Sequence, residues 1–135
     1  MSVTYGSWGS NVKDYGVKGD GSTDDASAIQ TMINEFNSLG NGGLLLFPPG
    51  IYIIGTELTL YNGIVFVGAG HETVLKLKDS TNPTHGLIYA TGKARIGLFD
   101  LTLDGNAANQ SGGSVIKLTS CANSAVKTCR IKGGY

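Results

Sequence analysis

Apolar residues follow a helical period in one stretch near the N-terminus and a strand-like pattern through most of the remaining chain. In the first stretch they recur at spacings of three and four, which places them on one face of a helix. Gly40 closes the stretch, and glycine commonly follows the last residue of a helix. The pattern predicts a single amphipathic helix over residues 25–39. Its apolar face consists of Ala26, Ile29, Met32, Ile33 and Phe36, with Leu39 as a further candidate.

Two neighbouring carboxylates stand where this helix begins. Asp24 and Asp25 follow the turn sequence GDG at residues 19–21, and they either perform chemistry or start the helix. A carboxylate at a helix N-terminus accepts hydrogen bonds from unpaired N–H groups and faces the positive end of the helix dipole. No nucleophile, histidine or second carboxylate cluster stands nearby in the sequence. We therefore interpret Asp24 and Asp25 as structural helix-cap residues.

From residue 44 onward the helical period gives way to short apolar runs separated by glycine, asparagine or proline. Runs of this length with these boundaries are typical of strands of about four residues each. The many glycines, 21 in all without a collagen-like period, agree with many tight turns. The runs are 44–47, 51–54, 58–60, 64–67, 74–77, 87–90, 96–103, 115–118 and 125–131.

An internal repeat joins the last of these runs. Residues 86–106 align with residues 114–134 at a constant offset of 28 positions, as in the pair Leu101 and Cys129. Repeats of this length without an internal helix are typical of solenoids whose coils stack strand on strand. In such a coil Leu101 and Leu103 would point inward, whereas Thr102 and Asp104 would point outward. The same offset places Lys132 beside Asp104 as a surface ion pair, which would contribute little stability.

The order of these motifs resembles a known superfamily. The segments VKDYGVKGDGSTDDASAIQTMINEF, GGLLLFPPGIYIIG, LTLYNGIVFVGAGHETVLKL and LFDLTLDGN are similar to the N-terminal portion of pectate-lyase-like proteins. That superfamily includes polygalacturonase-like hydrolases, uronan epimerases and bacteriophage tailspikes. The resemblance implies an all-β fold, a right-handed parallel β-helix whose N-terminal end is capped by the single helix. Residues 1–10 would form an N-terminal arm, and residues 11–135 the cap and the first coils, roughly three to four in number.

The resemblance leaves the catalytic residues unknown. Related hydrolases use several aspartates that converge on one face, together with a histidine and a basic pair. No such convergence is visible here, and we interpret RIK at residues 130–132 as a chance match. His71 and His85 stand in turns without a neighbouring acid, which favours solvated turn residues over catalytic bases. Whether the protein is an enzyme stays open at this point.

Asp100, Asp104 and Asn106 are the best local candidates for a carbohydrate-binding site. Polar side chains at strand ends of a β-helix can line a saccharide groove, or they can bind a calcium ion through oxygen ligands. The alternative is a solvated turn in which Asn106 stabilises its own backbone. No cofactor and no metal site is predicted, with calcium as the one exception considered. Tyr61 and Tyr89 could stack on sugar rings, although Tyr89, like Tyr52, lies in an apolar strand and could simply be packed.

Charge and cysteine content exclude several other classes of function. Ten basic and ten acidic residues give a net charge of zero, so neither nucleic acid nor an anionic membrane is an expected partner. The N-terminus lacks the features of a secretory signal, and no apolar run reaches the length of a membrane span. Cys121 and Cys129 are interpreted as small core or turn residues, with a disulfide as the less favoured alternative.

Two functions of different classes follow from the sequence. The first is the leading segment of a tailspike-like protein that binds or degrades a polysaccharide by hydrolysis or β-elimination. The second is a non-catalytic structural module of a phage tailspike or adhesin. Under either function the protein would be extracellular or virion-associated. The last coil has no visible cap, so we expect either a longer natural chain or a covering subunit, for example in a homotrimer. Trp8, Tyr5 and Tyr15 suggest an N-terminal docking contact, with packing across the cap as the alternative.

Overall fold

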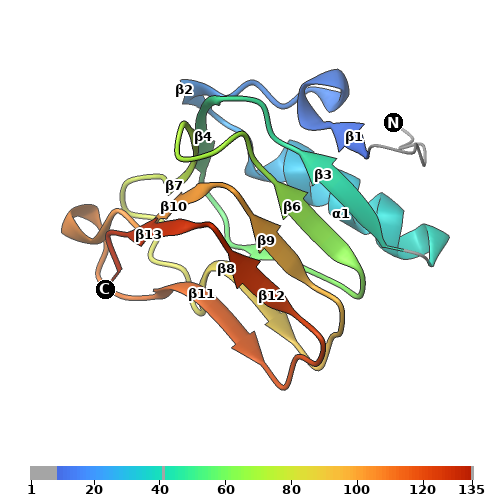
Figure 1. Cartoon of the computed structure of the whole chain (residues 1–135). Helices are drawn as coiled ribbons and strands as arrows, with labels where there is room; N and C mark the ends of the chain where they lie inside the picture. The colour runs from blue at the N-terminus through green and yellow to red at the C-terminus, as the bar shows by residue number, and fades with distance from the viewer. Residues whose placement is uncertain (1–8, 41, 135) are drawn as a thin grey trace.

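The computed structural model describes residues 9–40 and 42–134. These residues form coils that stack on one another, and the strands of successive coils form three parallel sheets (Figure 1). Sheet A contains β1 (Ser10–Asn11), β3 (Gly43–Leu46), β6 (Ile64–Val67), β9 (Gly97–Phe99) and β12 (Ala125–Lys127). Sheet B contains β2 (Asp20–Asp24), β4 (Gly50–Ile54), β7 (Thr73–Leu77), β10 (Thr102–Asp104) and β13 (Arg130–Lys132). Sheet C contains β5 (Leu58–Thr59), β8 (Gly86–Thr91) and β11 (Ser114–Thr119). Every strand pairs in parallel with its counterpart one coil away, so the predicted right-handed parallel β-helix is confirmed.

The register of the last two coils confirms the sequence repeat. Leu98 pairs with Val126 in sheet A, Leu103 with Ile131 in sheet B, and Ile88 with Ile116 in sheet C. Each pair is separated by the offset found in the sequence. A parallel ladder with constant offset stacks equivalent side chains directly above one another.

Left-handed backbone positions turn the chain from one sheet to the next. The run 96–103 is divided into β9 and β10 by Asp100, whose φ is 57°, and Thr128 divides the next coil at a φ of 54°. Arg95 and Asn123 repeat the same conformation at another corner. Non-glycine residues rarely adopt positive φ, so its recurrence at equivalent points of consecutive coils marks these corners as a regular feature of the solenoid.

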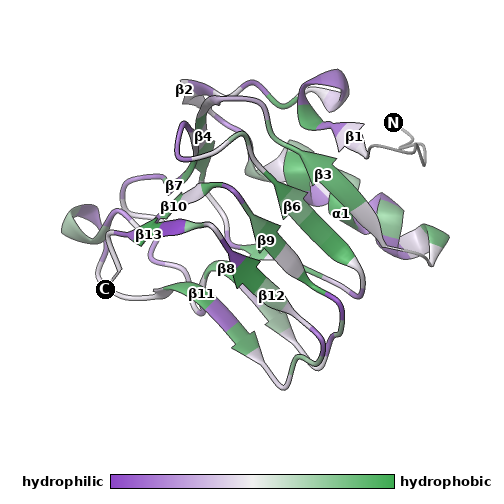
Figure 2. Ribbon diagram, in the orientation of Figure 1, coloured by the Kyte–Doolittle hydropathy of each residue, from purple (hydrophilic) through white to green (hydrophobic). Residues whose placement is uncertain are grey.

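Inward-facing apolar side chains fill the interior along the axis. Leu101 and Leu103 are fully buried, as are Leu45, Phe66 and Leu98 in sheet A. Figure 2 shows apolar residues along β3, β6 and β9. Thr102 alternates with the two leucines as predicted. It is nevertheless buried, because the turn that carries His71 covers it and the Thr102 hydroxyl donates to the His71 carbonyl at 3.0 Å.

The helix α1 (Ala26–Leu39) contacts β3 and β5 at the N-terminal end of the solenoid. Met32, Ile33 and Phe36 are buried, which confirms that this face packs on the first coil. Leu39 is 50% exposed and lies outside the apolar face. Gly40 ends the helix in the left-handed conformation, as expected of a C-terminal glycine.

Of the two aspartates predicted to cap α1, only Asp24 makes a side-chain hydrogen bond to the helix. Asp25 occupies the N-cap position, but its side chain makes no bond to the helix. Its buried carboxylate instead accepts the backbone N–H groups of Lys18 at 2.8 Å and Gly19 at 2.9 Å. The capping bond comes from Asp24, which accepts the N–H of Ala26 at 3.1 Å and that of Gly55 at 2.9 Å. Asp24 thus joins the helix to the first coil, whereas Asp25 fixes the preceding loop.

The segment read as a turn before the helix is a strand. β2 pairs in parallel with β4, with an irregular register between Asp20 and Asp24. Within it, Asp20 accepts the N–H groups of Thr23 at 2.8 Å and Ser22 at 3.0 Å, and these hydrogen bonds hold the pKa of Asp20 well below its usual range. Turn chemistry and strand pairing therefore coexist in this segment.

The N-terminal segment and the last described coil lie at the two ends of the described solenoid. Ser10, which the sequence assigned to the arm, already pairs with sheet A through Leu45. Trp8 and Tyr5 lie outside the described residues. Tyr15, in the short helix η1 (Val12–Tyr15), packs against the core. At the other end Ile131 is 50% exposed, because no further strand covers β13 in the part of the chain that the structure describes.

Cys121 and Cys129 are free and half-buried, and both pack against the core. This confirms the interpretation as small core or turn residues. Each thiol contacts a carbonyl of the preceding coil, Ala90 for Cys121 and Leu98 for Cys129.

Candidate functional site

The outer face of sheet B carries a row of charged side chains. Asp104 on β10 is register-matched with Lys76 on β7 and with Lys132 on β13. The Lys132 ammonium lies 3.7 Å from the Asp104 carboxylate, so the predicted surface pair is confirmed. Because Lys132 is half-exposed, water screens this pair and its contribution to stability is small.

Asn106 is directed into the protein. Its Nδ2 donates to the Leu77 carbonyl at 2.9 Å and to the Asp79 carboxylate at 2.7 Å, both one coil earlier. Its Oδ1 accepts from Asn109 at 2.9 Å, and its backbone N–H donates to Asp104 at 2.8 Å. The residue is buried and left-handed, with a φ of 51°. This geometry favours a structural role, although the bonds extend to the neighbouring coil rather than to its own backbone alone.

Asp100 lies two residues before β10 and Asp104 is its last residue, and no hydrogen bond or ion pair joins the two in the described part of the chain. Asp100 forms the corner between sheets A and B, where its carbonyl accepts the N–H of Gly70 at 2.7 Å. Asp104 ends the strand beside Lys132. A carbohydrate-binding role for Asp100, Asp104 and Asn106 stays a prediction, and of the three only Asp104 belongs to the charged row of sheet B.

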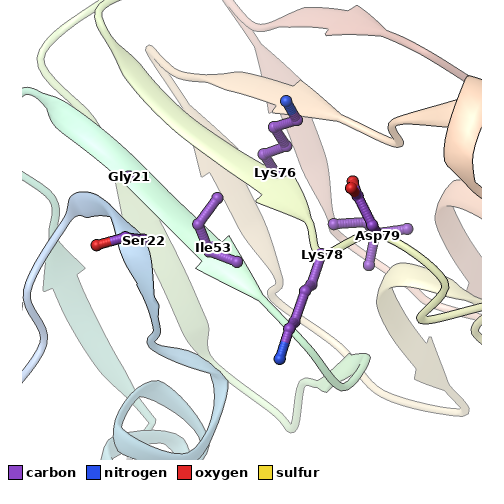
Figure 3. Close-up of a pocket in the computed structure, with 7 residues that line it drawn as sticks. Gly21, Ser22, Ile53, Lys76, Lys78 and Asp79 are labelled. Carbon is purple, nitrogen blue, oxygen red and sulfur yellow. The ribbon is translucent and has the colours of Figure 1, made fainter.

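A shallow pocket of about 310 Å³ opens on the same face (Figure 3). Figure 3 shows Lys76 and Lys78 extending in opposite directions, with Ile53 between Ser22 and Lys76. The lining residues are Gly21, Ser22, Ile53, Lys76, Leu77, Lys78 and Asp79. Two ammonium groups, a hydroxyl and an aliphatic surface can bind an acidic sugar, because charge-assisted hydrogen bonds to carboxylates are the stronger ones. The sequence signal for this site is the pair of lysines in LKLK at residues 75–78, which is not among the candidates named above.

A second polar cluster lies where the chain enters sheet C. His85 Nδ1 is 2.9 Å from Glu57 Oε1, and the backbone N–H groups of His85 and Gly86 donate to Glu57 Oε2 at 2.9 and 3.3 Å. Burial alone would raise the pKa of Glu57, but these hydrogen bonds outweigh it and lower the pKa. The imidazole also stacks on Tyr89, with ring centroids 3.8 Å apart.

His85 therefore differs from the solvated turn residue that the sequence suggested. Its acidic partner is distant in sequence, and the 28-residue step of the repeat, applied upstream of His85, leads to Glu57. His71 is exposed in its turn, as predicted. Tyr52 is fully buried, and Tyr61 is half-buried with the Lys93 ammonium 5.5 Å from its ring centre.

Metal ligands do not gather in the described part of the chain, where no group of three or more histidine, cysteine, aspartate or glutamate side chains could hold an ion. Among the helices of residues 9–40 and 42–134, none is long and apolar enough to cross a bilayer.

Comparison with known proteins agrees with the geometry. Residues 9–132 match the family described as rhamnogalacturonase A/epimerase, pectate lyase-like. The mannuronan C5-epimerase AlgE3 of Azotobacter vinelandii is 41% identical over 113 residues, which cover 75% of this chain and 6% of that protein. The preneck appendage protein of Bacillus phage PZA is 36% identical over 104 residues, which cover 73% of this chain and 12% of that protein.

A solved structure shows the same arrangement of coils. The A-module of the mannuronan C-5 epimerase AlgE6 from Azotobacter vinelandii superposes with a TM-score of 0.81 and 32% identity. The match covers 92% of this chain and 38% of that module. The chain therefore corresponds to a minor part of the length of each relative.

Proposed function

Because the chain belongs to the rhamnogalacturonase A/epimerase, pectate lyase-like family, we propose that it forms the N-terminal β-helix segment of a protein that binds and modifies an acidic polysaccharide. The observation that carries the proposal is the 41% identity with a mannuronan C5-epimerase across three quarters of the chain. The reaction we propose for the whole protein is removal of the proton at C5 of a uronate, followed by epimerisation or β-elimination. Such a protein acts outside the cell or on a virion.

The charged face of sheet B suits this substrate class. A uronate carries one carboxylate per sugar, and removal of the adjacent proton places more negative charge on that group. Lys76 and Lys78 lie at the pocket on this face, and an ammonium close to the carboxylate would stabilise that charge. We assign binding of the acidic chain to this pair.

Proton transfer requires an acid and a base beside the bound sugar, and residues 9–40 and 42–134 do not place such a pair at the sheet B pocket. Asp79 and Asp104 both accept hydrogen bonds from Asn106, which fix the turn after β10. His85 lies just before β8 of sheet C, away from this pocket. We infer that the segment supplies the capped scaffold and part of the binding face, while the acid and base belong to the remainder of the protein.

A second candidate function is a structural module of a phage appendage, which the 36% identity with the preneck appendage protein supports. In that case the solenoid would position other surfaces and assemble with further copies. A homotrimer in solution, measured by light scattering, would favour this candidate.

Affinity electrophoresis tests the polysaccharide proposal on the chain as it is. The expected result is slower migration in gels that contain mannuronan than in gels that contain neutral mannan. The double variant Lys76→Gln, Lys78→Gln should lose this retardation, whereas Lys127→Gln, an exposed lysine on sheet A, should keep it. Equal migration of the wild-type chain in both gels would overturn the binding role. Exchange of the C5 proton for deuterium by this chain alone would overturn the assignment of the acid and base to the remainder.

A further inference from the structure

The outer face of sheet A is apolar over three consecutive coils. Leu45, Phe66 and Leu98 are fully buried and paired in register, so the residues on either side of them in the strands point outward. These outward side chains are apolar and only half-buried, and we call them the sheet A patch: Leu44, Leu46, Val65, Val67 and Phe99. Strands with one face in water usually alternate, whereas Figure 2 shows β3 and β6 apolar along most of their length.

The side chains of the sheet A patch form one continuous surface. The register places Leu46 beside Val67 and Val67 beside Phe99. In the neighbouring row Gly97 contributes no side chain, but the Phe99 ring covers that position. A Cβ atom at Gly97 would meet this ring and the side chain of Val65. A contiguous apolar surface of this kind marks a place where another segment packs.

The sheet A patch lies next to the first described residues of the chain. Its far edge is β12, where the register places Lys127 beside Phe99 and a cation replaces the apolar side chains. Its near edge is β1, which pairs with β3. Gly9, just before β1, has a φ of 86°, and a Cβ atom there would meet the side chain of Leu44. The chain therefore changes direction beside the patch, in a conformation that glycine adopts readily.

Residues 1–8 have a composition and a length that suit this surface. Their sequence, MSVTYGSW, contains the aromatic residues Tyr5 and Trp8 and no charged side chain. An extended chain advances about 3.3 Å per residue, so Tyr5 can reach about 10 Å beyond Trp8. Two strand spacings, from β3 to β9, also amount to about 10 Å. The spacing of the two rings in the sequence thus matches the width of the patch.

We propose that residues 1–8 turn back at Gly9 and cover the sheet A patch of their own chain. The Trp8 indole packs on Leu44 and Val65, and the Tyr5 ring packs on Phe99. Burial of two aromatic rings against aliphatic side chains supplies the driving force. The covalent link at Gly9 favours this segment over a second copy of the chain, because a tethered segment is present at high effective concentration. The proposal is independent of any polysaccharide.

Tryptophan fluorescence of the whole chain tests the contact. Trp8 is the only tryptophan in the sequence, so its emission reports on this segment alone. We expect blue-shifted emission, and quenching by acrylamide several-fold weaker than in the urea-unfolded chain. Leu44→Gln should restore strong quenching. The matched variant Ile51→Gln alters an exposed aliphatic residue on sheet B and should leave the quenching unchanged. Circular dichroism checks that both variants are folded.

Methyl NMR spectra provide a second test that leaves the sheet itself unaltered. Trp8→Ala should shift the methyl signals of Leu44 and Val65, because the ring current of the indole is lost. Ser7→Ala is the control and should leave these signals in place. The methyl signals of Ile51 on sheet B should not move in either variant.

Three results would overturn the proposal. One is equal quenching of Trp8 in the native and the urea-unfolded chain. Another is a Trp8→Ala spectrum in which the methyl signals of Leu44 and Val65 are unchanged. The third is protection of Trp8 that disappears on dilution as light scattering shows a dimer or trimer dissociating, which would assign the patch to a second copy. Protection that persists in the monomer is the result we expect.

Discussion

The side chain of Asn106 bonds to the backbone of Leu77, one coil earlier, through a 2.9 Å hydrogen bond from Nδ2 to the carbonyl. Asn106 Nδ2 also donates to the Asp79 carboxylate, and Asn106 Oδ1 accepts a hydrogen bond from Asn109. One buried side chain therefore joins two consecutive turns. A parallel β-helix has no hairpins to fix its corners, and side chains of this kind take over that role.

Substitution of Asn106 should destabilise the chain by two separable effects. Asn106→Gly removes the amide but accommodates the left-handed backbone, and we expect a loss of about 1–3 kcal/mol in the free energy of unfolding. Asn106→Ala adds the cost of positive φ, about 1 kcal/mol more. Urea denaturation of the three proteins measures both terms. If alanine and glycine cost the same, the backbone at residue 106 carries no strain.

Asp25 should be more important for stability than its position at the N-cap suggests. Asp25→Ala leaves the N–H groups of Lys18 and Gly19 without an acceptor beside a buried site, which should cost about 2–4 kcal/mol. The control is Asp14→Ala, since Asp14 is an exposed aspartate in the short helix η1. Chemical denaturation compares the two variants, and a similar loss in both would contradict a specific role for Asp25.

Docking of α1 leaves no room for a side chain at Gly43. A Cβ atom there would meet the ring of Phe36, so Gly43→Ala should destabilise the protein by about 1–3 kcal/mol. Gly112→Ala is the matched control, because a Cβ atom at residue 112 meets open space. That variant should be neutral or slightly stabilising. Thermal unfolding followed by circular dichroism distinguishes the two, and an undisturbed melting temperature for Gly43→Ala would mean that the helix packs farther from β3.

Acid should weaken the corner held by Glu57. The pKa of Glu57 lies below its ordinary value of 4.5, so the folded state favours the carboxylate. Its contribution is therefore fully present above pH 4.5 and is lost as the pH falls through the lowered value. We expect Glu57→Gln to be less stable than the wild type at pH 7, with the difference shrinking toward pH 3. The control is Glu72→Gln, a glutamate at an exposed turn, and a loss at pH 7 as large as that of Glu57→Gln would contradict a specific role for Glu57.

Local and periodic features were readable from the sequence. The helical stripe from Ala26 to Phe36 depends on spacing within one segment, and the offset that pairs Leu98 with Val126 depends on repetition. The structure confirms both features, because the helix packs through its apolar face and the strands pair at the repeat offset. The strand β2 was not readable, since all five of its residues are exposed and its sequence has turn chemistry. Only the pairing with β4, distant in sequence, makes it a strand.

The candidate sites were harder to predict because they combine residues from different coils. His85 gains its character from Glu57 and Tyr89, and neither is its neighbour in the chain. Asn106 appears in the sequence as an ordinary turn residue, yet its burial follows from the carbonyl of Leu77 in the coil below. The lysines of the sheet B pocket stand two residues apart, Lys76 in β7 and Lys78 just after it, but the pocket exists because β2 and β4 bring Ser22 and Ile53 beside them.

The left-handed corners recur once per coil, so one coil is the unit by which this solenoid can be extended. Asp100 and Thr128 turn the chain at equivalent points of consecutive coils, as do Arg95 and Asn123. Duplicating residues 97–124 would insert a whole coil whose corners and inward side chains match both neighbours. One residue more or fewer within a strand would turn its inward side chains to the solvent. The protein can thus be lengthened in steps of whole coils, which offers a direct way to add binding rows to the outer face of sheet B without rebuilding the ends.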